Sequence, residues 1–173
     1  MCIEIIEYDD RYRDEAQSLL VELEMHIINL DEDHLDSLHP DYREKMLEHD
    51  LAEVSTHNGK CYLAIVGKTV AGLVMGIDRT YDESDYLDFS CPRAGVITEL
   101  VVGEKYRSMR IGEALVARME SYFRQIGCHY SYVDVFAYNS KALSFYEHHG
   151  YHPRMVTEIK QLCHEEEAEC ALS

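Results

Sequence analysis

A short basic loop lies between a β-branched segment and a segment with helical periodicity, and this arrangement can bind phosphate. The β-branched segment is Val96–Val102, and the helical segment is Ile111–Gln125. The first N–H groups of a helix have no intrahelical partner, and the helix dipole favours an anion beside them. Gly112 would let the backbone approach such a ligand closely. The spacing therefore predicts an anion site formed by Arg107, Ser108, Met109, Arg110, Ile111 and Gly112.

Arg110 has two interpretations, which differ in the backbone conformation at that position. If the loop needs a positive φ there, an arginine would strain it by roughly 1–2 kcal/mol. If Arg110 already lies in the first helical turn, its N–H can face the phosphate while its side chain points outward. We favour the helical interpretation, because arginine suits a helix and Ile111 continues the apolar stripe. The Arg110 guanidinium could instead pair with a phosphate of the ligand.

A second motif follows a predicted strand that begins near Cys128. Its pattern is N-x-x-A-x-x-x-Y-x-x-x-G-Y, and it starts at Asn139. Asn139 suits the N-cap of a short helix, Ser140–His148, which Gly150 ends. Asn139 and Tyr146 are seven residues apart, so we expect them on one face of that helix.

Together, the two motifs resemble those of the GNAT superfamily of acyl-CoA-dependent N-acyltransferases. The loop resembles that family's pyrophosphate loop, R/Q-x-x-G-x-G/A: Arg107 and Gly112 match, and Arg110 stands where the first glycine is usual. The second motif matches the family's pattern at every marked position. The resemblance implies acetyl-CoA as co-substrate, with its pyrophosphate on the loop and its arm beside Asn139.

The apolar spacing of the strand Val96–Val102 predicts a β-bulge. A step of three between Ile97 and Leu100, inside a period of two, indicates an extra residue. The resemblance implies the same feature, with the strand splaying from its neighbour to open a V-shaped slot. The pantetheine arm of acetyl-CoA would lie in that slot and pair with the backbone of Leu100, Val101 and Val102.

Acyl transfer to an amine needs a base for the ammonium proton, donors for the oxyanion and an acid for the departing thiolate. Tyr146 is the candidate acid, because a phenol with a pKa of about 10 keeps its proton at neutral pH. Its alternative role is packing in the core with Leu143. Glu99 is the candidate base, directly or through water, because partial desolvation raises a carboxyl pKa. Its alternative is a solvent-facing or substrate-positioning acid, and Asp134 and His129 are weaker candidate bases.

The sequence thus predicts an N-acetyltransferase that moves an acetyl group from acetyl-CoA to a primary amine by direct attack in a ternary complex. The acceptor would be a cationic small molecule, such as an aminoglycoside or a polyamine, or a peptide lysine. The alternative is a noncatalytic acyl-CoA sensor or interaction module on the same fold. Arg110, in place of the usual glycine, is the feature that supports this alternative. Acids on two predicted loops would attract a cation, and these are Asp31, Glu32, Asp33, Asp36, Asp82, Glu83, Asp85 and Asp88.

Composition limits the other classes of function. The formal charge of −17 argues against nucleic acid and against an anionic membrane as partners, although a solvated acidic surface explains it equally well. The six cysteines lack C-x-x-C spacing, and no segment has the pattern of a signal peptide or membrane span, so we expect a cytoplasmic protein. Gly150 separates His148 and His149 from His152, so we expect no metal site. A homodimer is left open.

The predicted fold is mixed α/β (α+β): a GNAT-like, mostly antiparallel central sheet with a splayed parallel strand pair, flanked by helices. One domain is predicted over residues 1–163, with an acidic tail at 164–173. The predicted helices are 11–29, 41–54, 111–125 and 140–148. The predicted strands are 2–8, 61–66, 70–77, 96–102, 130–136, one at Tyr151 and one at 155–162.

Overall fold

The computed structural model describes residues 3–90 and 92–162, apart from the side chain of Asp88. The chain divides into two compact units, Met1–Ser140 and Lys141–Ser173, and each is described by itself. The predicted acidic tail, 164–173, lies outside the described residues. The extent of the domain, 1–163, stays a prediction.

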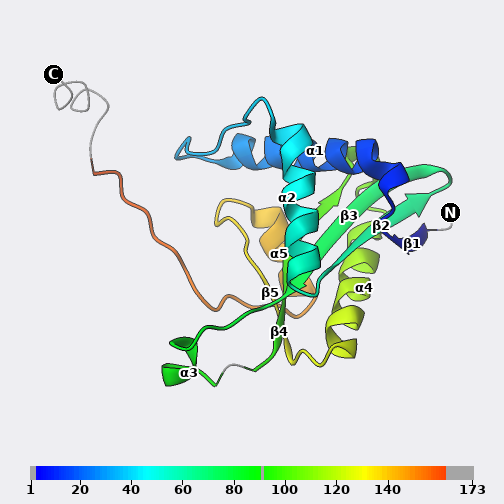
Figure 1. Cartoon of the computed structure of the whole chain (residues 1–173). Coiled ribbons are helices and arrows are strands. Elements are labelled where there is room, and N and C mark those ends of the chain that lie inside the picture. Colours follow the sequence, from blue (N-terminus) through cyan, green and yellow to red (C-terminus); the bar gives the residue numbers. More distant parts are fainter. Residues whose placement is uncertain (1–2, 91, 163–173) are drawn as a thin grey trace. The chain divides into compact units, whose positions relative to one another are not determined.

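A five-stranded sheet forms the centre of the first unit (Figure 1). The strands follow one another in the order of the chain; the first four are antiparallel neighbours, and the last two are parallel. This arrangement confirms the predicted mixed, mostly antiparallel sheet. The strands are β1 (Ile3–Glu7), β2 (Lys60–Val66), β3 (Thr69–Asp78), β4 (Ala94–Val102) and β5 (Tyr130–Val133).

The helices of the first unit begin and end close to the predicted positions, and α4 matches its prediction at both ends. They are α1 (Arg13–Leu30), α2 (Tyr42–Thr56), α3 (Asp85–Asp88) and α4 (Ile111–Gln125), with 3-10 turns η1 (Asp10–Tyr12) and η2 (Glu104–Tyr106). The short α3 was not predicted; it lies in the polar stretch before β4. Within the described ranges, no helix is both long and apolar enough to cross a membrane.

The helices cover the two faces of the sheet differently (Figure 1). On one face, α1 and α2 pack through Leu20 and Leu47 against a buried cluster from β2, β3 and β4. On the other face lies α4, and a Cβ added to Gly72 or Gly76 would come within 3.1 Å of the Leu115 side chain or 2.9 Å of the Met119 sulfur. These glycines let α4 lie close to the sheet. Since both faces are covered, the apolar side chains of β2 and β3 form nearly continuous runs instead of alternating.

The second unit contains α5 (Ser140–His148), which matches the predicted helix, and an aromatic cluster. The Tyr146 ring lies 5.2 Å from the Phe145 ring and 5.3 Å from the Tyr151 ring, centroid to centroid. The strands predicted at Tyr151 and at 155–162 are wrong, because residues 149–162 are neither helical nor extended in a sheet. A strand needs partners for its backbone groups, and Pro153 has no N–H to donate.

Candidate active site

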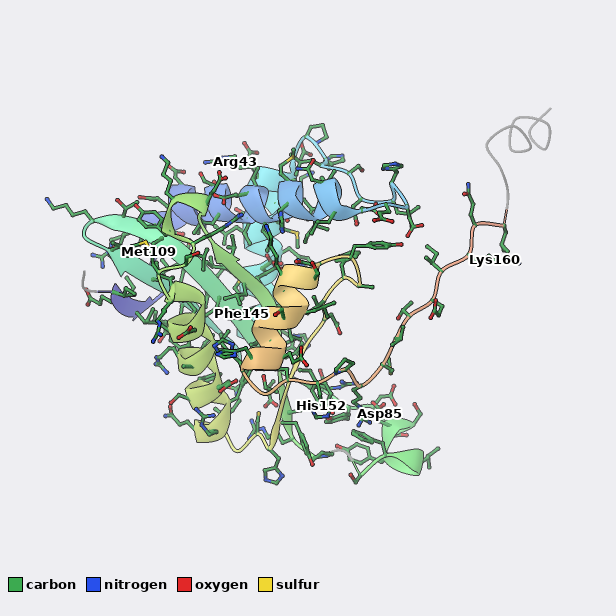
Figure 2. The ribbon with its side chains drawn as sticks, turned by 180° about the vertical axis from the view of Figure 1, so that it is seen from behind. Arg43, Asp85, Met109, Phe145, His152 and Lys160 are labelled. Atoms are coloured by element: carbon green, nitrogen blue, oxygen red, sulfur yellow. The ribbon has the colours of Figure 1, made fainter. Side chains whose placement is uncertain are left out.

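The loop between β4 and α4 turns the chain sharply before the helix begins. Arg107 is extended, with φ −61° and ψ 155°, whereas Ser108 has φ +63°. The first intrahelical hydrogen bond runs from the Ala114 N–H to the Arg110 carbonyl at 3.2 Å. The amides of the three residues between them, 111–113, have no intrahelical acceptor, as in any helix start. These N–H groups are the donors that an anion can use, and Figure 2 marks Met109 in the loop just before them.

Arg110 corrects the prediction that it lies in the first helical turn. It is the N-cap residue of α4, with φ +60° and ψ +20°, in the left-handed region. For a residue with a Cβ this conformation costs roughly 1–2 kcal/mol, and it persists only where the surrounding structure demands it. The helix propensity of arginine was therefore outweighed by the geometry of the strand-to-helix turn. The side chain of Arg110 is exposed, as predicted.

Arg107 is held on the protein by its guanidinium group. Its Nη2 atom lies 3.0 Å from Glu22 Oε1 on α1, and its Nε donates to the Val102 carbonyl at 3.3 Å. The same Glu22 oxygen accepts the Glu104 N–H at 2.8 Å. Arg107 and Glu22 thus tie the loop to α1 and to the end of β4. Direct contact of Arg107 with phosphate stays a prediction.

β4 leaves its parallel neighbour halfway along its length. Its first four residues, 94–97, pair with β5, and the pairing ends at Ile97 and Val133. Leu100, Val101 and Val102 pair only with β3 among the strands of the described chain. The outer backbone edge of these three residues can therefore pair with an amide-containing ligand arm, as the slot requires.

A β-bulge at Thr98 decides where Glu99 points, and it lies within the predicted interval. Gly76 pairs with Ile97 and Met75 pairs with Glu99, so Thr98 is an extra residue. Directly paired residues share a face of the sheet. Gly76 faces α4, whereas Met75 belongs to the core under α1 and α2. The bulge therefore turns Glu99 away from α4 and toward α1 and α2.

Glu99 meets acids from both helices on that face. Burial, which is the largest cause, and the charges of Asp50 on α2 and Glu24 on α1 together raise its pKa to about 8. Burial also raises the pKa of Glu24, which a hydrogen bond from the Tyr42 hydroxyl at 3.3 Å partly offsets. The pKa of Asp50 is raised by burial as well, against the opposing effect of His49. We call Glu24, Asp50 and Glu99 the carboxylate cluster.

Sequence reasoning found Glu99 but missed Glu24, Tyr42 and Asp50 as members of this site. A signal was present, because two of them occupy apolar positions of amphipathic helices. Glu24 follows Leu20 by four residues, and Asp50 follows Leu47 by three, so each shares the buried face of its helix. A charged residue at such a position indicates a buried polar site.

The acids predicted to line two rims have mixed roles. The Asp31 carboxylate accepts N–H groups from three following residues, and the hydrogen bond from Asp36 contributes most to lowering its pKa. Asp82 likewise accepts from the hydroxyl and N–H of Ser84, and its pKa is lowered. Both acids therefore hold their own loops in shape. Attraction of a cation by the remaining rim acids stays a prediction.

The boundary between the two units in the sequence falls within the second motif. Asn139 ends the first unit with Ser140; it is partly buried, and its N–H donates to the Phe136 carbonyl at 2.9 Å. Tyr146 belongs to the second unit, where it is buried, in agreement with either a catalytic or a packing role. The roles of Asn139 beside CoA and of Tyr146 as acid stay predictions.

Comparisons with known proteins agree with this architecture. Similar solved structures include a mutant protein from Bacillus halodurans (TM-score 0.78, 16% identity, covering 92% of this chain and 99% of that chain). Glucosamine-6-phosphate N-acetyltransferase from Arabidopsis thaliana is also similar (TM-score 0.63, 16% identity, covering 94% of this chain and 100% of that chain). Ribosomal-protein-alanine N-acetyltransferase from Brucella melitensis is similar as well (TM-score 0.67, 14% identity, covering 94% of this chain and 100% of that chain). At these identities the likeness shows the fold alone. A search of curated proteins gives no match.

The family itself is shown by a sequence model. The model of the acetyltransferase (GNAT) family matches residues 25–151, which is most of the chain. The matched range contains the loop between β4 and α4, β4 with its bulge and the second motif. The chain therefore belongs to the GNAT acetyltransferase family and is an acyltransferase, as its two motifs predicted.

Proposed function

We propose that this protein transfers an acetyl group from acetyl-CoA to a primary amine by direct attack in a ternary complex. The observation that carries the proposal is the position of Glu99. The bulge in β4 directs this carboxyl into a partly buried site, where burial, Asp50 and Glu24 raise its pKa to about 8. A base whose pKa is close to the working pH is suited to take a proton from an ammonium group.

Acetyl-CoA supplies the activated acetyl group, and the residues of the chain bind and orient it. The amides at the start of α4 would bind the pyrophosphate, and the free edge of β4 at Leu100–Val102 would pair with the pantetheine amides. Asn139 would lie beside the arm. These contacts would use backbone groups and a neutral side chain.

The proton transfers assign a role to each candidate. Glu99 accepts a proton from the acceptor's ammonium group, directly or through a water molecule, and the neutral amine then attacks the thioester carbonyl carbon. A C–N bond forms, and the C–S bond breaks as the intermediate collapses. Tyr146 gives its proton to the departing thiolate, and the second proton lost by the nitrogen replaces it. The products are the acetamide and free CoA, with one proton released to solvent through Glu99.

The direct test mixes the purified protein with acetyl-CoA and a pool of amines, and follows release of the CoA thiol. We expect release that depends on the amine, and a mass increase of one acetyl group on the acceptor. Acyl-CoA binding without amine-dependent release would instead support the sensor or interaction module.

Tyr146→Phe tests the acid. It removes one oxygen and keeps the ring packed, so kcat should fall on the order of 10²-fold while CoA affinity changes little. Tyr151→Phe removes the same atom from a neighbouring ring of the same cluster and should keep kcat within about twofold of wild type. Equal kcat values in the two variants would return Tyr146 to a packing role.

A further inference from the structure

The carboxylate cluster differs from two nearby acids on α1 and α2, Glu22 and Glu48, because its members have no arginine or lysine partner. Glu22 pairs with Arg107 at 3.0 Å, and Glu48 pairs with Arg13 at 3.3 Å. Within residues 3–90 and 92–162, no lysine or arginine forms an ion pair with any of the three cluster acids. Three carboxyl groups from three elements therefore influence one another electrostatically without a lysine or arginine partner.

The lack of a lysine or arginine partner costs free energy at Asp50, the least exposed acid of the cluster. The residue is 8% exposed, and its Oδ2 atom has no hydrogen-bond partner among the described residues. Only Oδ1 has a partner, the ring of the exposed His49 at 3.3 Å. Burying a charged oxygen without a partner costs free energy that packing cannot return. An acid kept in such a place indicates that the partner is a ligand.

Two neighbours of the cluster on α2, Tyr42 and Arg43, supply no positive charge to it. Tyr42 donates its hydroxyl to Glu24, and its own pKa is raised by burial and then by the charges of Glu24 and Glu99. Arg43, the next residue of α2, points instead to the N-terminal half of α1, where it contacts Ser18 Oγ at 3.1 Å (Figure 2). The missing charge must therefore come from outside the described chain.

We propose that the carboxylate cluster binds a second ammonium group of the acceptor, with Asp50 and Glu24 as its anchors while Glu99 serves the amine that is acetylated. The acceptor is then a diamine or polyamine with two ammonium groups on a flexible aliphatic chain. No three His, Cys, Asp or Glu side chains in the described ranges are grouped to share a metal ion. An elongated organic cation can span the separate carboxylates. This inference rests on the proposed transfer to an amine.

Asp50 is a specificity residue in this proposal, so its removal should change the choice of acceptor rather than the chemistry. The test compares wild type with Asp50→Asn on diaminobutane and diaminopentane, and on butylamine and pentylamine as acceptors with one amine. Wild type should prefer each diamine on the order of tenfold or more in kcat/KM. Asp50→Asn should lose most of that preference, because its kcat/KM falls much further for the diamines than for the monoamines. Glu44→Gln removes an exposed acid from the same helix and should keep the preference.

A stability readout separates binding from folding. Asp50→Asn replaces a buried carboxyl whose Oδ2 atom has no hydrogen-bond partner among the described residues, so its Tm should equal or exceed that of wild type. Diaminobutane with CoA should raise the Tm of wild type and of Glu44→Gln, but not that of Asp50→Asn.

Three results would overturn the inference. The first is equal kcat/KM of wild type for diamines and monoamines, and the second is an equal loss of kcat/KM for both classes in Asp50→Asn. The third is a lower Tm for Asp50→Asn, which would mean that the residue has a structural role. Failure of wild type to acetylate any amine would instead refute the proposed function, and diamine binding in the Tm assay would still report on the cluster.

Discussion

The loop before α4 and the carboxylate cluster serve different ligands in the proposed reaction, and they are built in opposite ways. The loop is six consecutive residues, 107–112, and it offers mainly backbone N–H groups, with its Arg107 already paired to Glu22. The cluster takes single side chains from α1, α2 and β4, and its charge has no lysine or arginine partner among the described residues. A backbone site tolerates changes of side chain, such as arginine for glycine at Arg110. In a site made of side chains, substitution of one residue changes which ligand the site prefers.

One extra residue connects the two regions. Without the bulge, regular pairing of Thr98 and strict alternation would place Glu99 on the same face as Ile97, against α4. The bulge puts Glu99 in the cluster while Leu100–Val102 keep their edge for the co-substrate. The strand thereby serves both ligands.

The largest expected effect is on the side-chain region. Glu99→Gln keeps the size of the side chain and removes the base, so kcat should fall on the order of 10²–10³-fold. CoA affinity, measured by calorimetry, should stay close to that of wild type, because the loop is untouched. Glu44→Gln, with the same chemical change on an exposed face, is the control. A Glu99→Gln variant with wild-type kcat would mean that Glu99 is not the base, and Asp134 and His129 would be the next candidates.

The converse change is in the backbone region. Gly112→Asp places a carboxylate beside the amides that would bind pyrophosphate, and CoA affinity should fall on the order of 10²-fold. An acid in the first turn suits the helix dipole, so the fold should survive, and circular dichroism can check this. Gly112→Ala, which adds bulk without charge, distinguishes repulsion from crowding. Unchanged CoA affinity in Gly112→Asp would remove the loop from the binding site.

The pH dependence also distinguishes the two regions, because the cluster contains a carboxyl group, that of Glu99, whose pKa is raised to about 8. With the pKa of Glu99 raised to about 8, kcat/KM should rise about tenfold per pH unit up to about pH 8 and then level off. A bound dication favours the ionised carboxylate, so the pKa seen in kcat should be lower than that seen in kcat/KM. Glu99→Gln should lack this rising limb.

Folding stability should fall as pH rises, whereas kcat/KM should increase. The Glu99 pKa is raised from its ordinary value of 4.5 to about 8. Between these values the unfolded chain has released the proton that the folded protein keeps, so folding stability falls as pH rises through this window. The stability of Glu99→Gln, relative to wild type, should increase from pH 5 to pH 8 in urea unfolding. A difference that does not vary with pH would mean that Glu99 titrates at its ordinary value.

The sequence predicts the locally encoded features of this site well. The start and end of α4, the helix α5 and the bulge in β4 follow from periodicity and from capping within a few residues of each feature. Glu24 and Asp50 are 26 residues apart and far from Glu99 in the chain, so only the packing of α1 and α2 on β4 brings the three together. No local pattern contains that contact.

Two errors show where local preference is outweighed. The alternating residues 155–162 favour a strand, yet a strand also needs a partner, and the described structure supplies none there. Arginine favours a helix, yet the turn between η2 and α4 needs a left-handed residue at Arg110. In both cases the deciding term is the geometry of neighbouring elements.

The smallest expected effect tests this backbone geometry directly. Arg110→Gly removes the left-handed strain, roughly 1–2 kcal/mol, but adds freedom to the unfolded chain, so stability should increase by about 0.5–1 kcal/mol. Ser108→Gly should act with the same sign, since Ser108 is also left-handed, whereas Arg107→Gly should destabilise because Arg107 is extended and paired. Urea midpoints rank the three variants. CoA affinity of Arg110→Gly should stay within about twofold of wild type if the loop binds through its amides, and a clear loss would mean that the guanidinium itself contacts a phosphate. A lower urea midpoint for Arg110→Gly would contradict the left-handed backbone at Arg110. Tolerance of arginine at that position could then no longer be cited as a property of a backbone site.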